Sequence, residues 1–339
     1  MTDYTTVKTL LETELRQQEQ AYPLAEKAFH SLMLLHKQPT ERVCLCFHGF
    51  TAGPYQFEPL GRRFFNAGYN VVVPLLPGHG RAGNWGKDNP PPLPVDPKEY
   101  LRFAVQWLNL AQRLGHRVVV CGLSGGGTLA AWLALEKATA IERAILFAPY
   151  LSGSSKVVDL FVQHADTFFT WTKTVAPSYP GFDVAALRAI LEIGQHCLKR
   201  VRQAPVAPTF TISSESDKAV SNVDHKRFFE AALKQQPLSW YNRFDKVLDI
   251  PHTMMTEQEG NRYQNLLIVM TQAFVESELT WIEVEEIAYY MTKGRTFRAV
   301  VADLGLAAKA SKDMPAMMTM VDKWSIVVGR ELSAKGRGW

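Results

Sequence analysis

A serine flanked by glycines is the strongest candidate for a reactive side chain. Residues 122–126 read GLSGG and match the pattern G-x-S-x-G, with Ser124 at its centre. The apolar run Arg117–Cys121 before the pattern predicts a strand, and the alanine-rich stretch Gly126–Lys137 after it predicts a helix. At such a sharp turn, glycines remove the Cβ atoms that would collide with the neighbouring strand and helix. The pattern in this setting predicts that Ser124 is a nucleophile.

A serine hydroxyl needs a base, and histidine is the side chain whose unperturbed pKa lies closest to neutral pH. His252 follows the last predicted strand after a short polar loop. His225 also lies downstream of the serine, but it falls at the start of the predicted helix 222–235. His116 precedes a strand, and so belongs to the opposite edge of a parallel sheet. We therefore predict that His252 is the base.

The base in turn needs an acid that accepts the imidazole Nδ1–H and stabilises the imidazolium. The segment SSESDKAV follows the predicted strand Thr209–Ser213 directly and offers two carboxylates. Asp217 is the predicted acid, with Glu215, Asp245 and Asp249 as alternatives. Serine, aspartate and histidine then follow one another along the chain in the order expected for a nucleophile on a strand–turn–helix.

The loop after an earlier strand offers the hydrogen-bond donors that a developing oxyanion needs. Residues 47–53 read FHGFTAG and follow the predicted strand Arg42–Phe47. One backbone N–H is expected from this loop, at Phe50, and one from Gly125, the residue after the nucleophile. A single donor of this kind stabilises a transition state by roughly 3–4 kcal/mol. His48 precedes the loop, and we predict that it braces the loop by hydrogen bonding rather than acting as the base.

The elements that must position these residues alternate between strands and helices. Strands are predicted at Ser31–His36, Arg42–Phe47, Tyr69–Leu75, Arg117–Cys121, Ala144–Phe147, Thr209–Ser213 and Leu238–Phe244. Helices are predicted at Tyr55–Ala67, Lys98–Leu114, Gly126–Lys137, 222–235 and Gly260–Glu276. Short apolar strands that alternate with helices indicate an α/β protein with a mostly parallel sheet and helices on both faces.

A chain of 339 residues predicts one large domain with an insertion or an appendage. After Pro149 the strand rhythm stops, and helical stretches are predicted at 155–173 and 183–202. This predicts a helical N-terminal segment at 1–30, a core at 31–149 and 206–278, a small helical cap at 150–205, and a helical C-terminal extension at 279–339.

Five motifs in order resemble one family. HGFTAGPYQF, GYNVVVPLLPGHG, GLSGGG, ESDKAV and IPHTM resemble bacterial carboxylesterases and monoacylglycerol-lipase-like members of the α/β-hydrolase superfamily, over roughly residues 31–275. The resemblance implies the α/β-hydrolase fold and ester hydrolysis through an acyl-enzyme. It places Ser124, Asp217 and His252 in the triad, and Phe50 and Gly125 at the oxyanion hole. Gly125 is a departure, because the family often has a larger side chain there.

The predicted function is therefore serine-dependent hydrolysis of a small-molecule carboxylic ester, with no cofactor and no metal. The same triad would also serve hydrolysis of a thioester, an amide or a C–C bond. A catalytically silent hydrolase fold that acts as a binding or interaction module is the alternative from another class. The extension 279–339 could hold a protein partner or mediate self-association.

Three features have two interpretations each. The aromatic side chains of the cap would either line a pocket for an apolar acyl or alkyl group or dock the cap on the core; they are Phe161, Phe168, Phe169, Trp171, Tyr179 and Phe182. The proline-rich loop Gly86–Pro97 is predicted to form a rim of the site rather than a polyproline ligand. The methionines of 314–320 are predicted to pack on the core rather than to bind a partner.

Composition excludes several other classes. The net charge of +4 is spread along the chain with no basic stripe between aromatic residues, which argues against nucleic-acid binding. No apolar run has the length for membrane insertion, and charges occupy the place of a signal peptide's apolar region. The four cysteines are predicted to be reduced small hydrophobes: Cys44, Cys46, Cys121 and Cys197. A cytoplasmic location is the resulting expectation.

Overall fold

The computed structural model describes residues 4–171 and 179–336. Its centre is a seven-stranded sheet with the order β1-β3-β2-β4-β5-β8-β9. The strands are β1 (Leu32–Leu34), β2 (Thr40–Phe47), β3 (Asn70–Val73), β4 (Gly115–Leu123), β5 (Arg143–Phe147), β8 (Thr209–Ser214) and β9 (Trp240–Phe244). β1 pairs with β3 in antiparallel orientation, and all other neighbours are parallel. The predicted α/β class with a mostly parallel sheet is confirmed.

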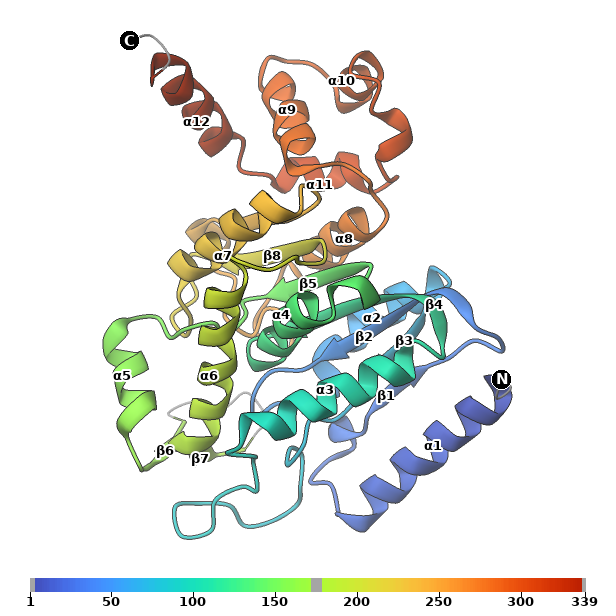
Figure 1. Ribbon diagram of the computed structural model, residues 1–339, viewed down its shortest axis with the longest axis vertical. Helices are drawn as coiled ribbons and strands as arrows, with labels where there is room; N and C mark the ends of the chain where they lie inside the picture. Colours follow the sequence, from blue (N-terminus) through green and yellow to red (C-terminus); the bar gives the residue numbers. More distant parts are fainter. Residues whose placement is uncertain (1–3, 172–178, 337–339) are drawn as a thin grey trace.

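Helices cover both faces of this sheet. On one face, α2 (Glu58–Asn66) packs against β3 and against α8 (Gln264–Val275). On the other face, α3 (Pro97–Ala111) and α4 (Gly125–Glu136) pack on the central strands, and α7 (Asn222–Gln235) packs on β8 (Figure 1). Because both faces are covered, strands such as β3 and β5 are buried along their whole length, which explains their apolar sequences.

The segment between β5 and β8 lies over the carboxyl end of the sheet. It contains α5 (Lys156–His164), the antiparallel pair β6 (Phe168–Thr170) and β7 (Gly181–Asp183), and α6 (Val184–Arg200). The predicted helix 155–173 is therefore wrong beyond His164, and its last two residues lie outside the described residues. The strands pair closely because Gly181 has no side chain; a Cβ there would lie 2.2 Å from the Phe169 carbonyl oxygen.

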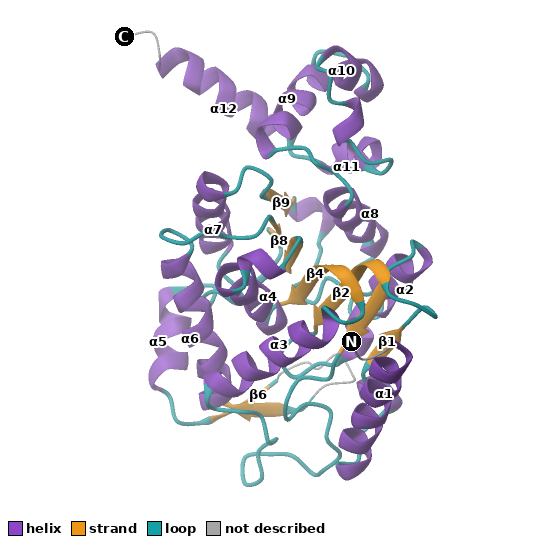
Figure 2. Ribbon diagram, turned by 45° about the vertical axis from the view of Figure 1, so that its right-hand side comes forward, coloured by secondary structure: helices purple, strands orange, loops and turns teal. Residues whose placement is uncertain are grey.

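Further helices flank the core at both ends of the chain. The helix α1 (Tyr4–Ala21) buries Val7, Leu11 and Leu15, while Leu10 is exposed. At the other end, α9 (Trp281–Thr292), α10 (Phe297–Asp303), α11 (Met314–Met320) and α12 (Lys323–Gly336) gather at one end of the molecule (Figure 2). No helix in the described part of the chain is both long and apolar enough to cross a membrane.

The methionines of 314–320 take the first of their two predicted roles. Met314, Met317 and Met318 are fully buried, and α11 packs on α8 of the core. The prediction that these side chains pack on the core is confirmed.

Candidate active site

The predicted site residues gather at one edge of the sheet. Ser124 follows β4 directly, and the loop with Phe50 follows β2. Asp217 follows β8, and His252 follows β9 after a short 3₁₀ turn. Because the carboxyl ends of parallel strands meet at one edge, segments far apart in sequence converge there.

The backbone at Ser124 is held in a strained conformation. Its φ of 53° and ψ of −117° are unusual for a residue with a side chain. The turn is tight, since a Cβ on Gly122 would lie 2.1 Å from the Gly126 carbonyl oxygen. The end of β5 pins the serine, because Ser124 N–H donates to the Phe147 carbonyl (2.9 Å) and Tyr150 N–H donates to the Ser124 carbonyl (3.0 Å). The strain lifts the hydroxyl above the sheet edge.

Three side chains form a continuous hydrogen-bonded chain. Ser124 Oγ–H donates to His252 Nε2 (2.9 Å), and His252 Nδ1–H donates to Asp217 Oδ2 (2.7 Å). The second oxygen of Asp217 accepts the Ala219 N–H at 2.8 Å. Burial raises the pKa of Asp217, but the charge and hydrogen bond of His252 outweigh it, so the net shift is downward. The carboxylate is thus ionised and able to stabilise an imidazolium.

The alternative acids lie in other interactions. Glu215 forms an ion pair with Arg243 at 2.6 Å. Asp245 accepts the Val247 N–H at 2.8 Å and caps a 3₁₀ turn that ends at Asp249. Of the four candidate carboxylates, the structure brings Asp217 to the imidazole.

The alternative bases are also accounted for. His225 is fully buried, donates from Nε2 to the Pro149 carbonyl (2.7 Å) and accepts the Ser213 hydroxyl at Nδ1 (2.8 Å). Burial lowers the pKa of His225 to about 4, so it stays neutral. His116 is exposed at the amino end of β4, away from the edge that carries Ser124.

The loop after β2 is braced as predicted. His48 Nε2 accepts the Leu76 N–H (2.9 Å), so its Nδ1 carries the proton and donates to the Gly49 carbonyl (2.9 Å). In a planar trans peptide the following N–H points opposite to that carbonyl. The Phe50 N–H therefore points away from the His48 ring. The predicted bracing role of His48 is confirmed.

Phe50 lies against Gly125, the residue after the serine. A Cβ added to Gly125 would lie 3.7 Å from Phe50 N and 3.4 Å from Phe50 Cβ. Within the described part of the chain, neither the Phe50 N–H nor the Gly125 N–H donates a hydrogen bond. Gly125 also begins α4, whose N-terminus favours negative charge. This arrangement can hold an oxyanion formed at Ser124.

A cavity of about 340 Å³ opens at Ser124 and His252. One part of its wall is apolar and comes from Phe50, Leu123, Tyr150, Trp171, Phe182 and Leu187. Another part is polar and comes from Tyr55, Gln56, Thr253 and Glu259. The cavity is therefore suited to a molecule with both an apolar and a polar portion.

The aromatic side chains of the predicted cap do not share one role. Trp171 and Phe182 line the cavity. Tyr179 docks the segment instead, because its hydroxyl donates to the Gly78 carbonyl (2.7 Å) and accepts the Arg81 N–H (2.8 Å). Phe161 has neither role, since 45% of its surface is exposed.

The proline-rich loop Gly86–Pro97 supports the cavity wall from behind. Its Leu93 is buried in one cluster with Phe182, and Phe50 packs against this cluster. Both phenylalanines line the cavity. Among the described residues that line the cavity, none comes from this loop. The predicted rim is thus a buttress.

One polar group of the cavity wall has no counterpart among the residues predicted from sequence. Glu259 is 5% exposed and accepts hydrogen bonds from Gln56 Nε2 (2.6 Å) and the Tyr55 hydroxyl (3.2 Å). Burial raises the pKa of Glu259, and its hydrogen bonds partly offset that shift. Gln56 lies within the motif HGFTAGPYQF, but no sequence signal distinguishes Glu259 from the nearby exposed Glu257.

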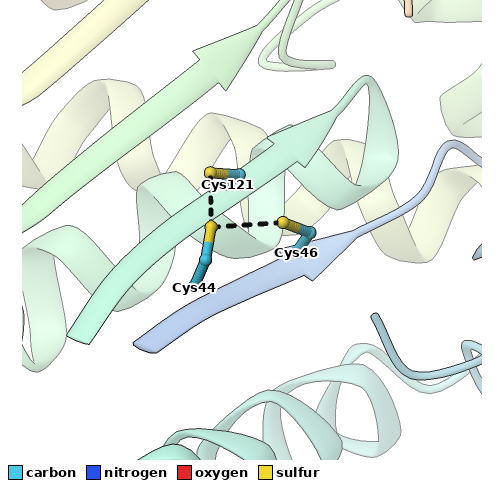
Figure 3. Close-up of side chains that lie close together, drawn as sticks. All are labelled: Cys44, Cys46 and Cys121. Carbon is cyan, nitrogen blue, oxygen red and sulfur yellow. Dashed lines mark hydrogen bonds between the residues drawn. The ribbon is translucent and has the colours of Figure 1, made fainter. Parts of the chain in front are cut away.

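Three thiols from β2 and β4 lie close together (Figure 3). Among the described residues, Cys44, Cys46 and Cys121 form the one group of three with ligand atoms close enough to share a metal ion, all within 4.8 Å. All three residues are fully buried, and Cys46 of β2 lies opposite Cys121 of β4. Burial raises the pKa of Cys46 and Cys121, so two of the three thiols disfavour the thiolate that a metal requires. Hydrogen bonds with Cys121 and Cys46 lower the pKa of Cys44 to about 5. Their position in the core agrees with the prediction that they pack as small hydrophobes.

Comparison with known proteins agrees with this architecture. Residues 44–303 match the model of a family described as the alpha/beta hydrolase family. No curated protein sequence matches the chain. The match extends past residue 275, where the resemblance of the sequence motifs ends.

Several solved structures share the fold at low sequence identity. A metagenome-derived lipolytic enzyme of the LipS and LipT pair has a TM-score of 0.56 and 19% identity, over 75% of this chain and 98% of that chain. Est1E from Butyrivibrio proteoclasticus, with ferulic acid bound, has a TM-score of 0.51 and 13% identity, over 70% and 90%. A monoacylglycerol lipase from Paleococcus ferrophilus has a TM-score of 0.50 and 13% identity, over 63% and 88%.

Proposed function

The chain belongs to the alpha/beta hydrolase family, and from this premise we propose that it hydrolyses carboxylic esters through an acyl-enzyme on Ser124. The observation that carries the proposal is the hydrogen-bonded chain from Ser124 through His252 to Asp217. The structural neighbours named as a lipolytic enzyme and a monoacylglycerol lipase support an ester as the substrate.

In the acylation step, His252 Nε2 takes the proton of Ser124 as Oγ attacks the ester carbonyl carbon. The carbonyl oxygen becomes an oxyanion and accepts hydrogen bonds from the N–H groups of Phe50 and Gly125. When the intermediate collapses, the C–O bond to the alcohol breaks, and His252 gives its proton to the leaving oxygen. Asp217 stabilises the imidazolium during both transfers.

Deacylation repeats these steps with water. His252 takes a proton from a water molecule, whose oxygen attacks the acyl carbon, and the same backbone N–H groups hold the second oxyanion. Collapse releases the carboxylic acid, and the proton on His252 returns to Ser124 Oγ. The cycle needs neither a cofactor nor a metal.

The cavity wall supports an ester with an apolar group. Trp171, Phe182 and Leu187 offer a surface that an acyl or alkyl chain can cover. A cavity of about 340 Å³ matches a small ester rather than a polymer or a folded protein.

The first test is labelling of the full-length protein with a fluorophosphonate, which reacts with an activated serine. We expect labelling of the wild type and of His116→Ala, whose histidine is exposed at the other edge of the sheet. Labelling is expected to vanish in Ser124→Ala and His252→Ala. A folded wild type that does not label would contradict the proposal and favour a silent binding module.

A substrate panel then distinguishes the reactions that share a triad. Matched p-nitrophenyl esters, thioesters and anilides with acyl chains of increasing length would be compared by kcat/KM. We expect the esters to be preferred and kcat/KM to rise with chain length until the apolar wall is covered. A higher kcat/KM for thioesters or anilides would reassign the substrate class while keeping the triad.

A further inference from the structure

A buried carboxyl group lies next to the proposed triad without belonging to it. Glu259 Oε1 accepts hydrogen bonds from Gln56 Nε2 (2.6 Å) and the Tyr55 hydroxyl (3.2 Å), and its Oε2 accepts the Thr256 hydroxyl (3.0 Å). Within the described part of the chain, it has no ion pair with a lysine or arginine. Burial of a carboxyl group costs free energy unless it is hydrogen-bonded, so the hydrogen bonds of Glu259 indicate its role.

The first of these bonds sets the orientation of the Gln56 side chain. Gln56 is 1% exposed, and its amide lies between Glu259 on one side and the Gly49 N–H on the other. A backbone N–H can only donate, so the Gln56 oxygen must face Gly49, at 2.7 Å. The amide NH₂ must then face an acceptor, and Glu259 supplies it. The opposite orientation would place two donors against each other.

Gln56 in turn fixes the N–H of Gly49, the residue before the proposed oxyanion donor Phe50. The Gly49 N–H is fixed by Gln56, and the Gly49 carbonyl accepts bonds from His48 Nδ1 (2.9 Å) and from the Ala52 N–H (3.1 Å). With both of its polar groups held, Gly49 has little freedom to rotate. The direction of the next N–H, that of Phe50, follows from peptide planarity.

We propose that Glu259 is a positioning residue that, through Gln56 and Gly49, directs the Phe50 N–H at the oxyanion. The proposal rests on ester hydrolysis at Ser124 and goes beyond the triad and its two donors. The side chain of Glu259 makes no hydrogen bond to the nucleophile or the base, and the charge of His252 acts on it to lower its pKa. Through Gln56, its effect falls on transition-state stabilisation. Displacing this donor raises the free energy of the transition state, in which the oxyanion forms, and changes that of the ground state little.

The test exchanges the hydrogen-bond donor and acceptor between Gln56 and Glu259. Gln56→Glu places two carboxyl groups 2.6 Å apart in the wild-type geometry and removes the NH₂ donor. Glu259→Gln alone keeps an acceptor for Gln56, since its amide oxygen can take that place. The double variant Gln56→Glu/Glu259→Gln restores a matched pair, with the new glutamate accepting from Gly49 and from the new glutamine.

We expect Gln56→Glu to lower kcat by about 100-fold at neutral pH with KM changed by less than about threefold. Glu259→Gln and the double variant are expected to stay within about fivefold of wild type. Glu257→Gln, at an exposed position two residues earlier, is the matched control and is expected to leave kcat unchanged. Thermal melting would identify any loss of folded protein.

Inhibition by an alkyl trifluoromethyl ketone separates positioning from a loss of folded enzyme. Its adduct with serine carries an oxyanion, so its Ki should rise in Gln56→Glu by about the same factor as kcat/KM falls, and recover in the double variant. An inactive unfolded fraction would lower the apparent kcat without changing Ki. Wild-type kcat in Gln56→Glu, or failure of the double variant to recover, would overturn the inference. A wild type that neither labels nor turns over esters would instead overturn the proposed function.

Discussion

The strained backbone at Ser124 is possible because several residues around it have no side chain. Its φ of 53° is tolerated because the neighbouring residues at the turn have no Cβ to obstruct the approach of β2. Gly126 is as tight as Gly122, since a Cβ there would lie 2.1 Å from the Phe47 carbonyl oxygen and 2.4 Å from that of His48. Both neighbours are backbone atoms of the strand and loop that carry the proposed oxyanion donor.

Gly126→Ala is therefore expected to destabilise the protein by about 3 kcal/mol, because the strand and the helix must separate to admit the methyl group. The measurement is the urea midpoint and slope, with fluorophosphonate labelling as a second readout. Gly86→Ala is the control, because no heavy atom lies within 4 Å of its added Cβ, and it should change stability by less than about 0.5 kcal/mol. Equal midpoints for the two variants would contradict the steric explanation.

Asp217→Asn is expected to lower kcat by roughly 10⁴-fold while the protein stays folded, because an amide can hold the wrong imidazole tautomer and cannot stabilise the imidazolium. The comparison is with Glu215→Gln, which removes the neighbouring carboxylate that pairs with Arg243. That variant should retain kcat within about twofold of wild type, since its ion pair is partly exposed. A large loss in Glu215→Gln with none in Asp217→Asn would exchange the roles of the two acids.

At the residue scale, the residues that could be predicted are those marked by their neighbours in the sequence. Ser124 stands out because its motif and its flanking strand and helix are contiguous, and His252 and Asp217 follow from strand ends in chain order. Glu259 is different. Its partner Gln56 lies 203 residues away along the chain, and nothing near Glu259 in sequence indicates burial. Such a pairing becomes visible only when the loops after β2 and β9 are brought together.

At the element scale, prediction succeeds for strands that are apolar runs between turns and fails for β6 and β7. The sheet strands are apolar runs between turns, so their positions could be predicted. The strands β6 and β7 have three residues each, too few to show alternation. Phe168 and Phe169 therefore extended the apparent helix that precedes them.

A charged cluster joins three sheet strands at their amino ends. Glu142, just before β5, pairs with Arg42 of β2 at 2.8 Å and with Arg117 of β4 at 3.1 Å. Burial raises the pKa of Glu142, but its hydrogen bond with Arg42 and the nearby charges outweigh this and lower it overall. The cluster holds the strands that end at the proposed nucleophile and oxyanion loop.

Glu142→Gln is expected to cost about 2 kcal/mol at pH 7, because the Arg42 guanidinium loses its charged acceptor. Since the folded pKa of Glu142 is depressed, its stabilisation is present above the unfolded value of about 4.3 and is lost as pH falls through the folded value. Urea midpoints at pH 7 and pH 3 should therefore differ less in the variant than in wild type. Glu41→Gln, at an exposed partner of Arg117, should change the midpoint little. An unchanged pH dependence in Glu142→Gln would contradict this assignment.

At the scale of the whole molecule, the helices after α8 are the part that sequence patterns describe least. The motifs that carry the family resemblance end before residue 279, and a helical stretch with methionines fits either a packed core or a binding face. The choice depends on tertiary contact. Met314, Met317 and Met318 are fully buried, and Trp240 Nε1–H of β9 donates to the Leu279 carbonyl at 2.9 Å. The segment is thus continuous with the core through α8, while α12 packs on α9 farther away (Figure 1).

Deletion of residues 279–339 is therefore expected to leave a protein that aggregates or does not fold. Each of the three buried methionines contributes about 2–5 kcal/mol on the scale of methionine-to-alanine changes, and their sum is comparable with the total stability of a domain, about 5–15 kcal/mol. Deletion of residues 323–339 removes α12, whose Ile326 is 9% exposed, and should lower stability by only about 1–2 kcal/mol. Thermal melting and size-exclusion chromatography of both truncations check this, with fluorophosphonate labelling to report on the site. If the longer deletion stays monomeric, melts as the wild type does and still labels, then α9–α11 are a separate appendage and their buried methionines do not support the hydrolase core.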